Sequence, residues 1–284
     1  MNFLRGLKHF GFLINKAVSK SETLLALKDG LFRASAKLRP FKFRRTRYLE
    51  SWLRFTVEPE STPLPIPLKL YCIWAGTNPM SPNRKRSIQA IREKNKGLEV
   101  EMVTPDNLKN YVLPEHPLHP AYEFLSLVHK SDYLRAYLMH YYGGGYCDIK
   151  VPKCSWTDII IAMNNSENIW VQGFQELSSR MCAQIDGQMG KHVRRHFCEI
   201  VGTSGFLVRP QTALTREWLS EVERRLSYYQ NLLNDNPGNE RGDNPGYPVP
   251  WTALLGQIFQ PLQLKYLDHV KIDNRLLLSF ENYK

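Results

Sequence analysis

The segment Ser131–Lys150 constrains the fold of this chain more than any other. It reads SDYLRAYLMHYYGGGYCDIK, a run with helical periodicity followed by three glycines and a short apolar stretch. The periodicity predicts an amphipathic helix over Tyr122–Tyr142 with one buried stripe. The apolar positions of that stripe are Leu125, Val128, Leu134, Leu138 and Tyr141. Gly143–Gly145 predict the end of the helix, because glycine adopts the left-handed C-cap conformation and lets the backbone approach a ligand. Tyr146–Ile149 then predicts a short strand whose end carries an aspartate.

Three polar residues of this segment predict a ligand site. Asp132 and Arg135 share one face of the expected helix, and Asp148 stands at the end of the expected strand. Ligands of open α/β sheets bind at the carboxyl ends of the strands, where a carboxylate can hold a divalent cation against a diphosphate. Alone, Asp132 and Arg135 would also suit an ordinary ion pair on a helix surface, worth a few tenths of a kcal/mol. Together with the glycines and Asp148, they favour a nucleotide-sugar site.

Upstream segments predict the first half of a nucleotide-binding sheet. Leu68–Trp74 and Leu98–Val103 are expected strands. Ser81-Pro82 supplies a helix N-cap and a proline at the first helical position, and Thr104–Asp106 repeats that signal for a short helix ending at Tyr111. The resulting βαβα order predicts an α/β fold.

A second long helix and a long loop are expected downstream. Thr212–Tyr229 has helical periodicity. Its inner side consists of Leu214, Trp218, Leu219, Val222 and Leu226. Asn234–Pro248 is rich in turn residues, and a loop of that length inside a domain is usually functional or disordered. As a functional loop it would close over a donor or bind an acceptor, and Asp243 or Asn244 could supply a metal ligand. Plain disorder is the alternative.

The basic charge of the chain is confined to one end. Residues 1–54 contain thirteen Lys and Arg and three acidic residues, a net of +10 out of the chain's +11. Apolar residues recur there at helical spacing, with cations between them. The apolar residues are Phe3, Leu4, Leu7, Phe10, Ile14, Ala17, Val18 and Leu25, and the cations are Arg5, Lys8, Lys16, Lys20 and Lys28. We therefore expect a basic amphipathic helical segment over residues 1–60, and a catalytic domain over residues 61–284 that begins with the proline-rich linker Ser61–Pro67. Such a helix binds anionic membrane surfaces, here through residues 1–54. Packing on the protein's own body, or oligomerisation, is the alternative.

Other partners and the compartment follow from the same sequence. Charge confined to one end, without a nucleic-acid module, argues against nucleic acid as a partner. No run approaches 18 apolar residues, so no transmembrane helix is expected. The cations within the N-terminal apolar stretch do not fit a cleavable signal. The cysteines form a dispersed set without metal-type spacing. They are Cys72, Cys147, Cys154, Cys182 and Cys198. The expected location is a reducing cytoplasm, peripheral on the inner face of the membrane.

The central segment resembles the DXD-containing sugar-binding region of glycosyltransferase family 32. The resemblance consists of Ser-Asp-x-x-Arg starting at Ser131, then a glycine pair, an aromatic residue and Asp148. Leu70–Gly76 is similar to the first strand and Trp-x-Gly turn of that family, and Gly205–Pro210 and Tyr247–Thr252 are similar more weakly. Bacterial capsular-polysaccharide and lipopolysaccharide transferases share this region. The resemblance implies a GT-A type nucleotide-sugar-binding sandwich around a Rossmann-like central sheet, with the basic helical segment as an N-terminal appendage.

The resemblance also implies roles for individual residues. Asp132 would bind sugar or ribose hydroxyls, Arg135 would reach sugar and diphosphate, and Asp148 would be the first aspartate of DXD and the metal ligand. The implied catalytic residues are Arg135, Asp148 and Lys150. The implied substrate-binding residues are Trp74, Gly76, Ser131, Asp132, Arg135, Gly144, Gly145, Asp148, Asp243, Trp251 and Thr252.

Two tryptophans, Trp74 and Trp251, suit either a ligand-binding or a core-packing role. Trp74 would stack on a uracil ring in this family, although a tryptophan at a strand end also suits a core or rim position. Trp251 and Thr252 would touch the diphosphate by the same analogy. Trp251 as a core anchor of the last helix is the alternative.

The main departure from the family is Lys150, which stands where the second aspartate of DXD would be. A charged ammonium has no lone pair and cannot ligate a metal. In the interpretation that we favour, Asp148 holds Mn²⁺ or Mg²⁺ with ligands from a later loop. In a second, Lys150 neutralises the leaving diphosphate and the metal is weak or absent. In a third, Lys150 is simply solvated.

The expected function is the transfer of a hexose from a nucleotide sugar, most of all a UDP-sugar, to a cell-surface glycan or lipid-linked oligosaccharide. The resemblance to family 32 implies that the transfer is retaining. Retention needs no dedicated general base, because the leaving diphosphate accepts the acceptor's proton. An inverting mechanism would need one, with Glu240, Asp243 or His196 as candidates. Two other functions stay open: an inactive GT-A-fold scaffold, suggested by Lys150, and a toxin-like transferase acting on a protein.

Overall fold

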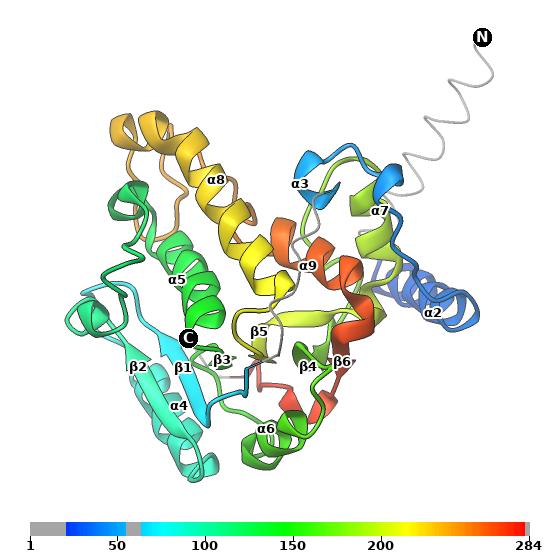
Figure 1. Cartoon of the computed structure of the whole chain (residues 1–284), viewed down its shortest axis with the longest axis horizontal. Coiled ribbons are helices and arrows are strands. Elements are labelled where there is room, and N and C mark those ends of the chain that lie inside the picture. The colour runs from blue at the N-terminus through cyan, green and yellow to red at the C-terminus, as the bar shows by residue number, and fades with distance from the viewer. Residues whose placement is uncertain (1–20, 55–63, 282–284) are drawn as a thin grey trace.

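The computed structural model describes residues 21–54 and 64–281, which are organised around a six-stranded mixed sheet. The strands are β1 (Lys69–Ile73), β2 (Glu99–Val103), β3 (Gly144–Cys147), β4 (Val171–Gln175), β5 (Val201–Val208) and β6 (Val270–Ile272). Their order across the sheet is β2-β1-β3-β5-β4-β6 (Figure 1). β1 pairs in parallel with β2 and β3, whereas β5 pairs antiparallel with β3 and β4. The parallel half is Rossmann-like and confirms the predicted α/β class.

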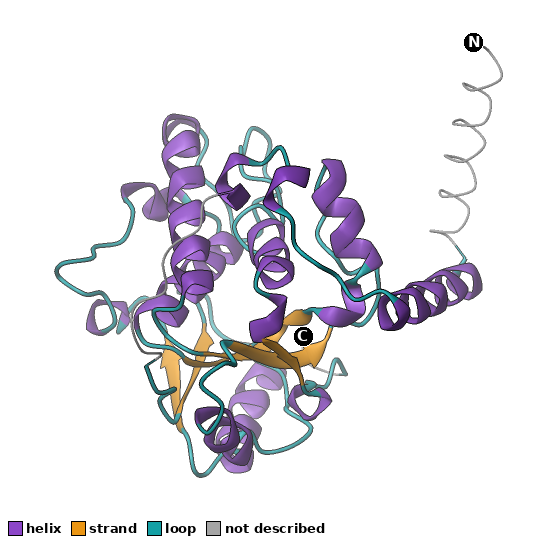
Figure 2. Cartoon of the chain, turned by 45° about the vertical axis from the view of Figure 1, so that its right-hand side comes forward, coloured by secondary structure: helices purple, strands orange, loops and turns teal. Residues whose placement is uncertain are grey.

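Helices cover both faces of this sheet (Figure 2). They are α2 (Glu22–Leu38), α3 (Ser51–Arg54), α4 (Pro82–Lys94), α5 (Leu127–Tyr141), α6 (Thr157–Asn164), α7 (Gly187–Arg195), α8 (Ala213–Asp235) and α9 (Gly256–Lys265). Short 3-10 helices are Arg45–Arg47, Leu108–Asn110, Pro120–Phe124, Phe197–Glu199, Leu267–His269 and Asn274–Leu276. α4 and α6 lie on one face of the sheet, and α5, α8 and α9 lie on the other.

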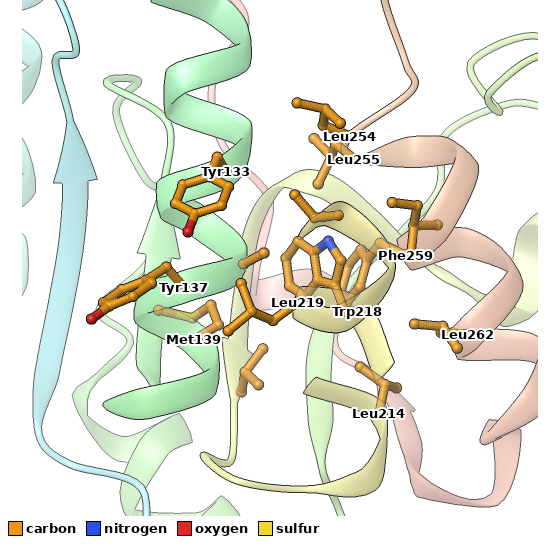
Figure 3. Packing of buried hydrophobic residues seen from close by; sticks show 14 of the residues in the cluster. Tyr133, Tyr137, Met139, Leu214, Trp218, Leu219, Leu254, Leu255, Phe259 and Leu262 are labelled. Atoms are coloured by element: carbon orange, nitrogen blue, oxygen red, sulfur yellow. The ribbon is translucent and has the colours of Figure 1, made fainter. Parts of the chain in front are cut away.

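Successive side chains of β1 point alternately into two hydrophobic cores. Tyr71 and Ile73 point into the core shared with α5, α8 and α9, while Leu70 and Cys72 point into the core shared with α4 and α6. A strand buried on both faces is typical of sheets with helices on each side. Figure 3 shows the larger core, where the Trp218 ring of α8 stacks on the Phe259 ring of α9 with centroids 4.4 Å apart.

The central helix differs from its prediction in two ways. The expected helix over Tyr122–Tyr142 is interrupted, because Leu125 is extended and Ser126 caps a new helix by accepting a hydrogen bond from the His129 amide. In addition, α5 is buried almost all round, including Asp132 and Arg135, instead of along one stripe. The surface ion-pair interpretation of these two residues is therefore wrong, because β3 and α8 both pack against this helix.

The predicted N-caps agree with the structure better than the predicted extent of the central helix does. Ser81 caps α4, with Pro82 in its first turn. Thr212 caps α8, and the five predicted inner residues of that helix are buried. Thr104–Tyr111 forms only a 3-10 turn at Leu108–Asn110. The Asn107 side chain accepts the Thr104 amide and donates to Met102 O, which ties this segment to β2.

The three glycines separate the helix from the strand by different means. Gly143 has a positive φ of 66° and its amide bonds to Leu138 O, as a helix C-cap glycine does. Gly144 and Gly145 already belong to β3. A Cβ on Gly145 would lie 2.7 Å from Leu70 Cδ1, so a larger residue there would have to displace the end of the Leu70 side chain.

The described part of the N-terminal segment is attached to the body. Phe41, Tyr48 and Leu53 are buried in the same core as the sheet. The predicted periodic helix before Ser21 lies outside the described residues. Within the described residues, no helix is long and apolar enough to cross a bilayer.

Candidate active site

A cavity of about 480 Å³ opens at the carboxyl ends of β1 and β3. The chain passes from β1 to β2 on one side and then returns to β3 on the other side of β1. Such a change of direction leaves a crevice between the two strand ends, which is where open α/β sheets bind ligands. The lining residues are Ile73, Trp74, Ala75, Gly76, Asn78, Arg84, Leu127, Val128, Ser131, Asp132, Arg135, Tyr146, Asp148, Ile149, Lys150, Glu240, Arg241 and Trp251.

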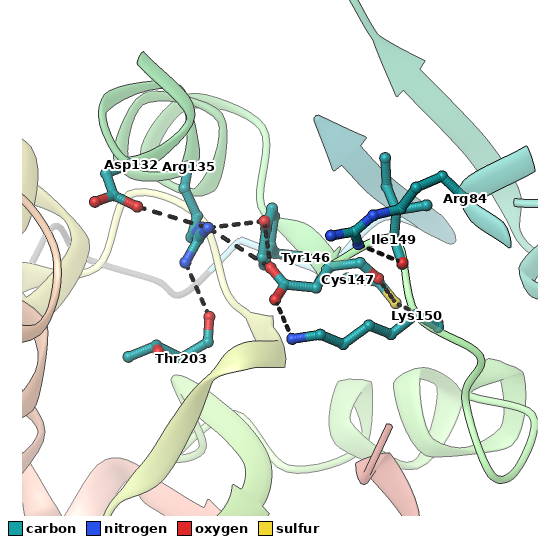
Figure 4. Close-up of polar contacts among 9 residues, drawn as sticks. Arg84, Asp132, Arg135, Tyr146, Cys147, Ile149, Lys150 and Thr203 are labelled. Carbon is teal, nitrogen blue, oxygen red and sulfur yellow. Dashed lines mark hydrogen bonds and ion pairs between the residues drawn. The ribbon is translucent and has the colours of Figure 1, made fainter. Parts of the chain in front are cut away.

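Asp148 is the centre of a charge cluster among the residues that line this cavity. Figure 4 shows Arg135, Tyr146 and Lys150 of this cluster. The Lys150 ammonium lies 2.7 Å from Asp148 Oδ2, and the Tyr146 hydroxyl donates to Asp148 Oδ1 over 2.7 Å. Arg135 Nη2 lies 3.8 Å from the same Oδ1. Tyr146 and Asp148 reach each other because residues two apart along an extended strand point to the same side.

Arg135 is held from several sides. Its Nη1 donates to Thr203 O over 2.9 Å and its Nη2 donates to the Tyr146 hydroxyl over 2.8 Å. Asp132 Oδ1 lies 3.6 Å from Nη2. The guanidinium also lies over the Tyr146 ring, 3.9 Å from its centroid. Among the described residues nothing accepts a hydrogen bond from the buried Nε. The guanidinium is thus fixed while one donor is left unused.

The two carboxyl groups of the cavity titrate in opposite directions. Burial by itself would raise the pKa of Asp148, but the Lys150 and Arg135 cations and the hydrogen bonds from Lys150 and Tyr146 outweigh it, so that its pKa is lowered. Burial raises the pKa of Asp132, and the attraction of Arg135 offsets this only in part. The surroundings of Asp148 therefore favour its charged form, whereas burial disfavours the charged form of Asp132.

These residues supply few ligands to a divalent cation. Both oxygens of Asp148 already face cations or a hydroxyl donor, and Lys150 stands where a second ligand would be needed. Within residues 21–54 and 64–281, no group of three His, Cys, Asp or Glu side chains could hold a metal. The described residues by themselves supply only Asp148 to the predicted Mn²⁺ or Mg²⁺, so the metal stays a prediction. The second interpretation, in which Lys150 supplies the positive charge, also stays a prediction.

Loop residues proposed as extra ligands point elsewhere. Asp243 Oδ1 accepts the Asn239 side-chain amide over 2.7 Å, and Asn244 bonds to the Asn239 amide and to Pro237 O. Neither residue lines the cavity. The loop is nonetheless an ordered part of the site, because Gly238 N donates to Phe124 O and the loop places Glu240 and Arg241 in the cavity wall.

Aromatic side chains lie at the rim. Trp74 is partly buried and its indole Nε1 donates to Asn78 O over 2.8 Å. Trp251 is 62% exposed and lines the cavity, so the interpretation of Trp251 as a core anchor is wrong. Gly76 also lines the cavity, and a Cβ there would come within 2.6 Å of Leu127 Cδ1.

Only some of the remaining predicted site residues line the cavity. Ser131 lines the cavity, whereas Gly144, Gly145 and Thr252 do not. The Thr252 carbonyl accepts the Gln257 amide near the start of α9. His196 lies away from the cavity, beside Glu199 and Phe41.

Sequence reasoning missed Arg84 and Tyr146. The Arg84 guanidinium donates to Ile149 O over 2.7 Å and lines the cavity. Its signal was present, because it occupies the first turn of the helix that follows β1, which begins at the carboxyl edge of the sheet. Tyr146 had no such signal, since an aromatic in a strand ordinarily indicates core packing.

Comparison with known proteins supports a relation to capsule synthesis. Residues 67–151 match the model of a family described as capsular polysaccharide synthesis protein. This stretch contains β1, α4, β2, α5 and β3, and therefore most of the cavity wall. The match does not extend to glycosyltransferase family 32 or to a DXD motif. No curated protein and no solved structure matched the chain.

Proposed function

We propose that this protein is a glycosyltransferase of capsular or related surface-polysaccharide synthesis. It moves a hexose from a nucleotide sugar, a UDP-sugar above all, to a glycan or lipid-linked oligosaccharide acceptor. The observation that carries the proposal is the charge cluster at the β1/β3 crevice, where Arg84, Arg135 and Lys150 converge on one cavity. The family match over residues 67–151 gives the biological setting. A GT-A type of sheet is part of the proposal.

The cations suit a nucleoside diphosphate. Guanidinium groups bind phosphate oxygens through paired N–H donors, and an ammonium neutralises a leaving diphosphate as a point charge. Trp74 at the end of β1 offers an aromatic face to the base, and Asp132 suits sugar or ribose hydroxyls because it can both accept and, when protonated, donate.

In the proposed reaction the bond between the sugar's anomeric carbon and the diphosphate oxygen breaks. A bond between the same carbon and the acceptor oxygen forms on the same face of the sugar. The acceptor proton passes to the leaving diphosphate, whose negative charge is stabilised by Lys150 and Arg135. Asp148 acts by holding these two cations in position, and the reaction needs no divalent metal.

The proposal is tested with the purified full-length protein and a panel of nucleotide sugars. Release of nucleotide is followed with added Mn²⁺ and with EDTA. We expect release from one UDP-sugar at the same rate in both conditions, and loss of that release in Asp148→Asn. The control is Glu123→Gln, an exposed carboxylate outside the cavity. Metal-dependent release would overturn the metal-free part, whereas tight UDP binding without any turnover on added glycan acceptors would indicate the scaffold alternative.

Glu240 separates retention from inversion, because it is the one candidate base of the three whose residue lines the cavity. Under a retaining mechanism, Glu240→Gln keeps most of the turnover rate, since no protein base is needed. A loss on the order of a hundredfold or more would assign Glu240 as the base of an inverting reaction. The anomeric configuration of the product, determined by NMR, gives an independent answer.

A further inference from the structure

Helix α2 exposes leucines on the side that faces away from the protein. Leu24, Leu27, Leu31 and Leu38 are 42%, 63%, 64% and 83% exposed. Their spacings of three, four and seven residues place them on one face of an α-helix, within an arc of about 60°. The helix lies at the periphery of the molecule beside α7 (Figures 1 and 2).

The opposite face of α2 already binds the body. Ala36 is buried, Phe32 packs against the main core, and the Asp29 carboxylate accepts the Ser179 amide. A surface helix in water ordinarily has one apolar face and a polar outer face. Here the outer face is apolar as well, so packing on the described residues of the protein does not account for it.

Unpaired cations follow the helix along the chain. Arg39, Lys42, Arg44, Arg45 and Arg47 are all exposed. In the described parts of the chain, none of them forms an ion pair with a carboxylate. They line two adjacent hollows of about 290 and 460 Å³ whose described lining contains no Asp or Glu.

α7 adds further positive charge and joins the hollows to α2. Arg195 lines the smaller hollow and donates from Nη2 to Ser35 Oγ over 2.8 Å. Ser35 lies on α2 within about one residue's rotation of the leucine face. The leucines and the cations thus belong to one continuous region, which we call the basic-leucine surface: α2, residues 39–47 and Arg195.

We propose that the basic-leucine surface docks the protein on a bilayer of anionic lipids. Leucine side chains gain free energy only in an apolar phase, and unpaired cations gain it next to anionic headgroups. A soluble polyanion would satisfy the cations but leave the leucines in water. The boundary between headgroups and acyl chains satisfies both, as it does for interfacial amphipathic helices. This inference does not depend on the proposed transfer reaction.

The test uses the full-length protein and sedimentation with two kinds of vesicle: phosphatidylcholine alone, and phosphatidylcholine mixed with phosphatidylglycerol. We expect binding to the anionic vesicles only, weakening as salt is added because screening shortens the reach of the charges. Leu27→Ser with Leu31→Ser should lower the partition coefficient by about tenfold. Arg44→Glu, Arg45→Glu and Arg47→Glu together should lower it by about a hundredfold.

Matched controls separate this surface from general effects. Leu232→Ser removes an exposed leucine of α8, and Arg92→Glu, Lys96→Glu and Lys109→Glu reverse three exposed cations elsewhere, giving the same net charge as the triple variant of the surface. These variants should bind as the unchanged protein does, and thermal melts should show that all variants fold. Absence of binding to anionic vesicles overturns the proposal. Unchanged binding in the Leu27/Leu31 variant also overturns it, because a polyanion site would then suffice. A dimer that the leucine substitutions dissociate, without vesicle binding, would assign the surface to a second copy.

Discussion

The cavity and the basic-leucine surface are both rich in cations, but they use them in opposite ways. At the cavity, the side chains of Arg135 and Lys150 are 8% and 10% exposed and each faces Asp148. At the basic-leucine surface, residues 39–47 carry five exposed cations without a carboxylate partner in the described chain. Buried charges must be neutralised by neighbours, whereas exposed charges are neutralised by water and salt.

The difference separates stability from binding. Removing a charge from the cavity leaves its partner uncompensated in a low-dielectric site, so folding suffers along with chemistry. Removing one from the basic-leucine surface leaves nothing behind that water cannot solvate. Mutations should therefore affect unfolding at the first region and only the affinity for anions at the second.

The largest expected effect belongs to Arg135→Ala. It leaves Asp132 and Asp148 without their shared cation and should lower the free energy of unfolding by about 3 to 5 kcal/mol. Urea denaturation followed by circular dichroism measures this change. The matched control is Arg44→Ala, for which we expect less than about 0.5 kcal/mol. Equal effects at both positions would remove the contrast between the two regions.

Glu176 is a buried carboxyl group with no ion-pair partner among the described residues, which makes it a useful contrast to Asp148 in the cavity. Burial raises the pKa of Glu176 from 4.5 to about 7. The folded state therefore holds this proton more tightly than the unfolded chain does. Between pH 4.5 and 7 the free energy of unfolding should fall as pH rises, by up to about 3 kcal/mol in total, and it should then level off.

The measurement is the free energy of unfolding from pH 4 to 9, compared with Glu176→Gln. The variant cannot titrate at this position, so the difference between the two profiles isolates Glu176. A difference that does not change with pH would show that the carboxyl keeps its ordinary pKa when folded.

Lys150→Met is expected to act on chemistry. Loss of the ammonium beside the leaving diphosphate should lower kcat/KM for donor turnover by about a hundredfold. Lys153→Met, at an exposed lysine three residues further on, is the control and should leave turnover unchanged. If Lys150→Met gained activity with Mn²⁺, the lysine would occupy the place of a metal ion rather than act on the leaving diphosphate independently of any metal.

The smallest expected effect concerns folding at the basic-leucine surface. Arg44→Glu, Arg45→Glu and Arg47→Glu together should change the free energy of unfolding by less than about 1 kcal/mol, because none of the carboxylates in the described residues loses a partner. Thermal and urea denaturation in low and high salt measure it. A large loss of stability would mean that these cations are held by contacts within the fold.

Local signals predicted much of the parallel half-sheet. Ser81-Pro82 and Thr212 started helices where the structure has them, because an N-cap acts on amides two or three residues away. The same kind of signal at Thr104 gave only a 3-10 turn at Leu108–Asn110. Ser126 was missed as a cap, although it had the required residue type.

The sequence predicted several residues of the candidate site, but only some of the predicted residues lie together at the cavity. Trp74, Asp132, Arg135 and Asp148 meet at one cavity because each lies near a strand end or on the adjoining helix. Asp243, Thr252 and His196 do not line this cavity, since each lies in a segment that makes its contacts elsewhere in the fold. No periodicity or spacing in the sequence predicts these contacts.

The sequence by itself determined the α/β order of elements, the caps of α4 and α8, and the aspartate that follows β3. These depend on interactions between residues close together in the chain. Only the tertiary structure decided that α5 is buried on all sides, that Lys150 closes on Asp148, and that Arg84 reaches the same cavity. It also decided which face of α2 is left outside. Burial and charge pairing depend on which surfaces pack together over long sequence separations, and a local pattern cannot specify them.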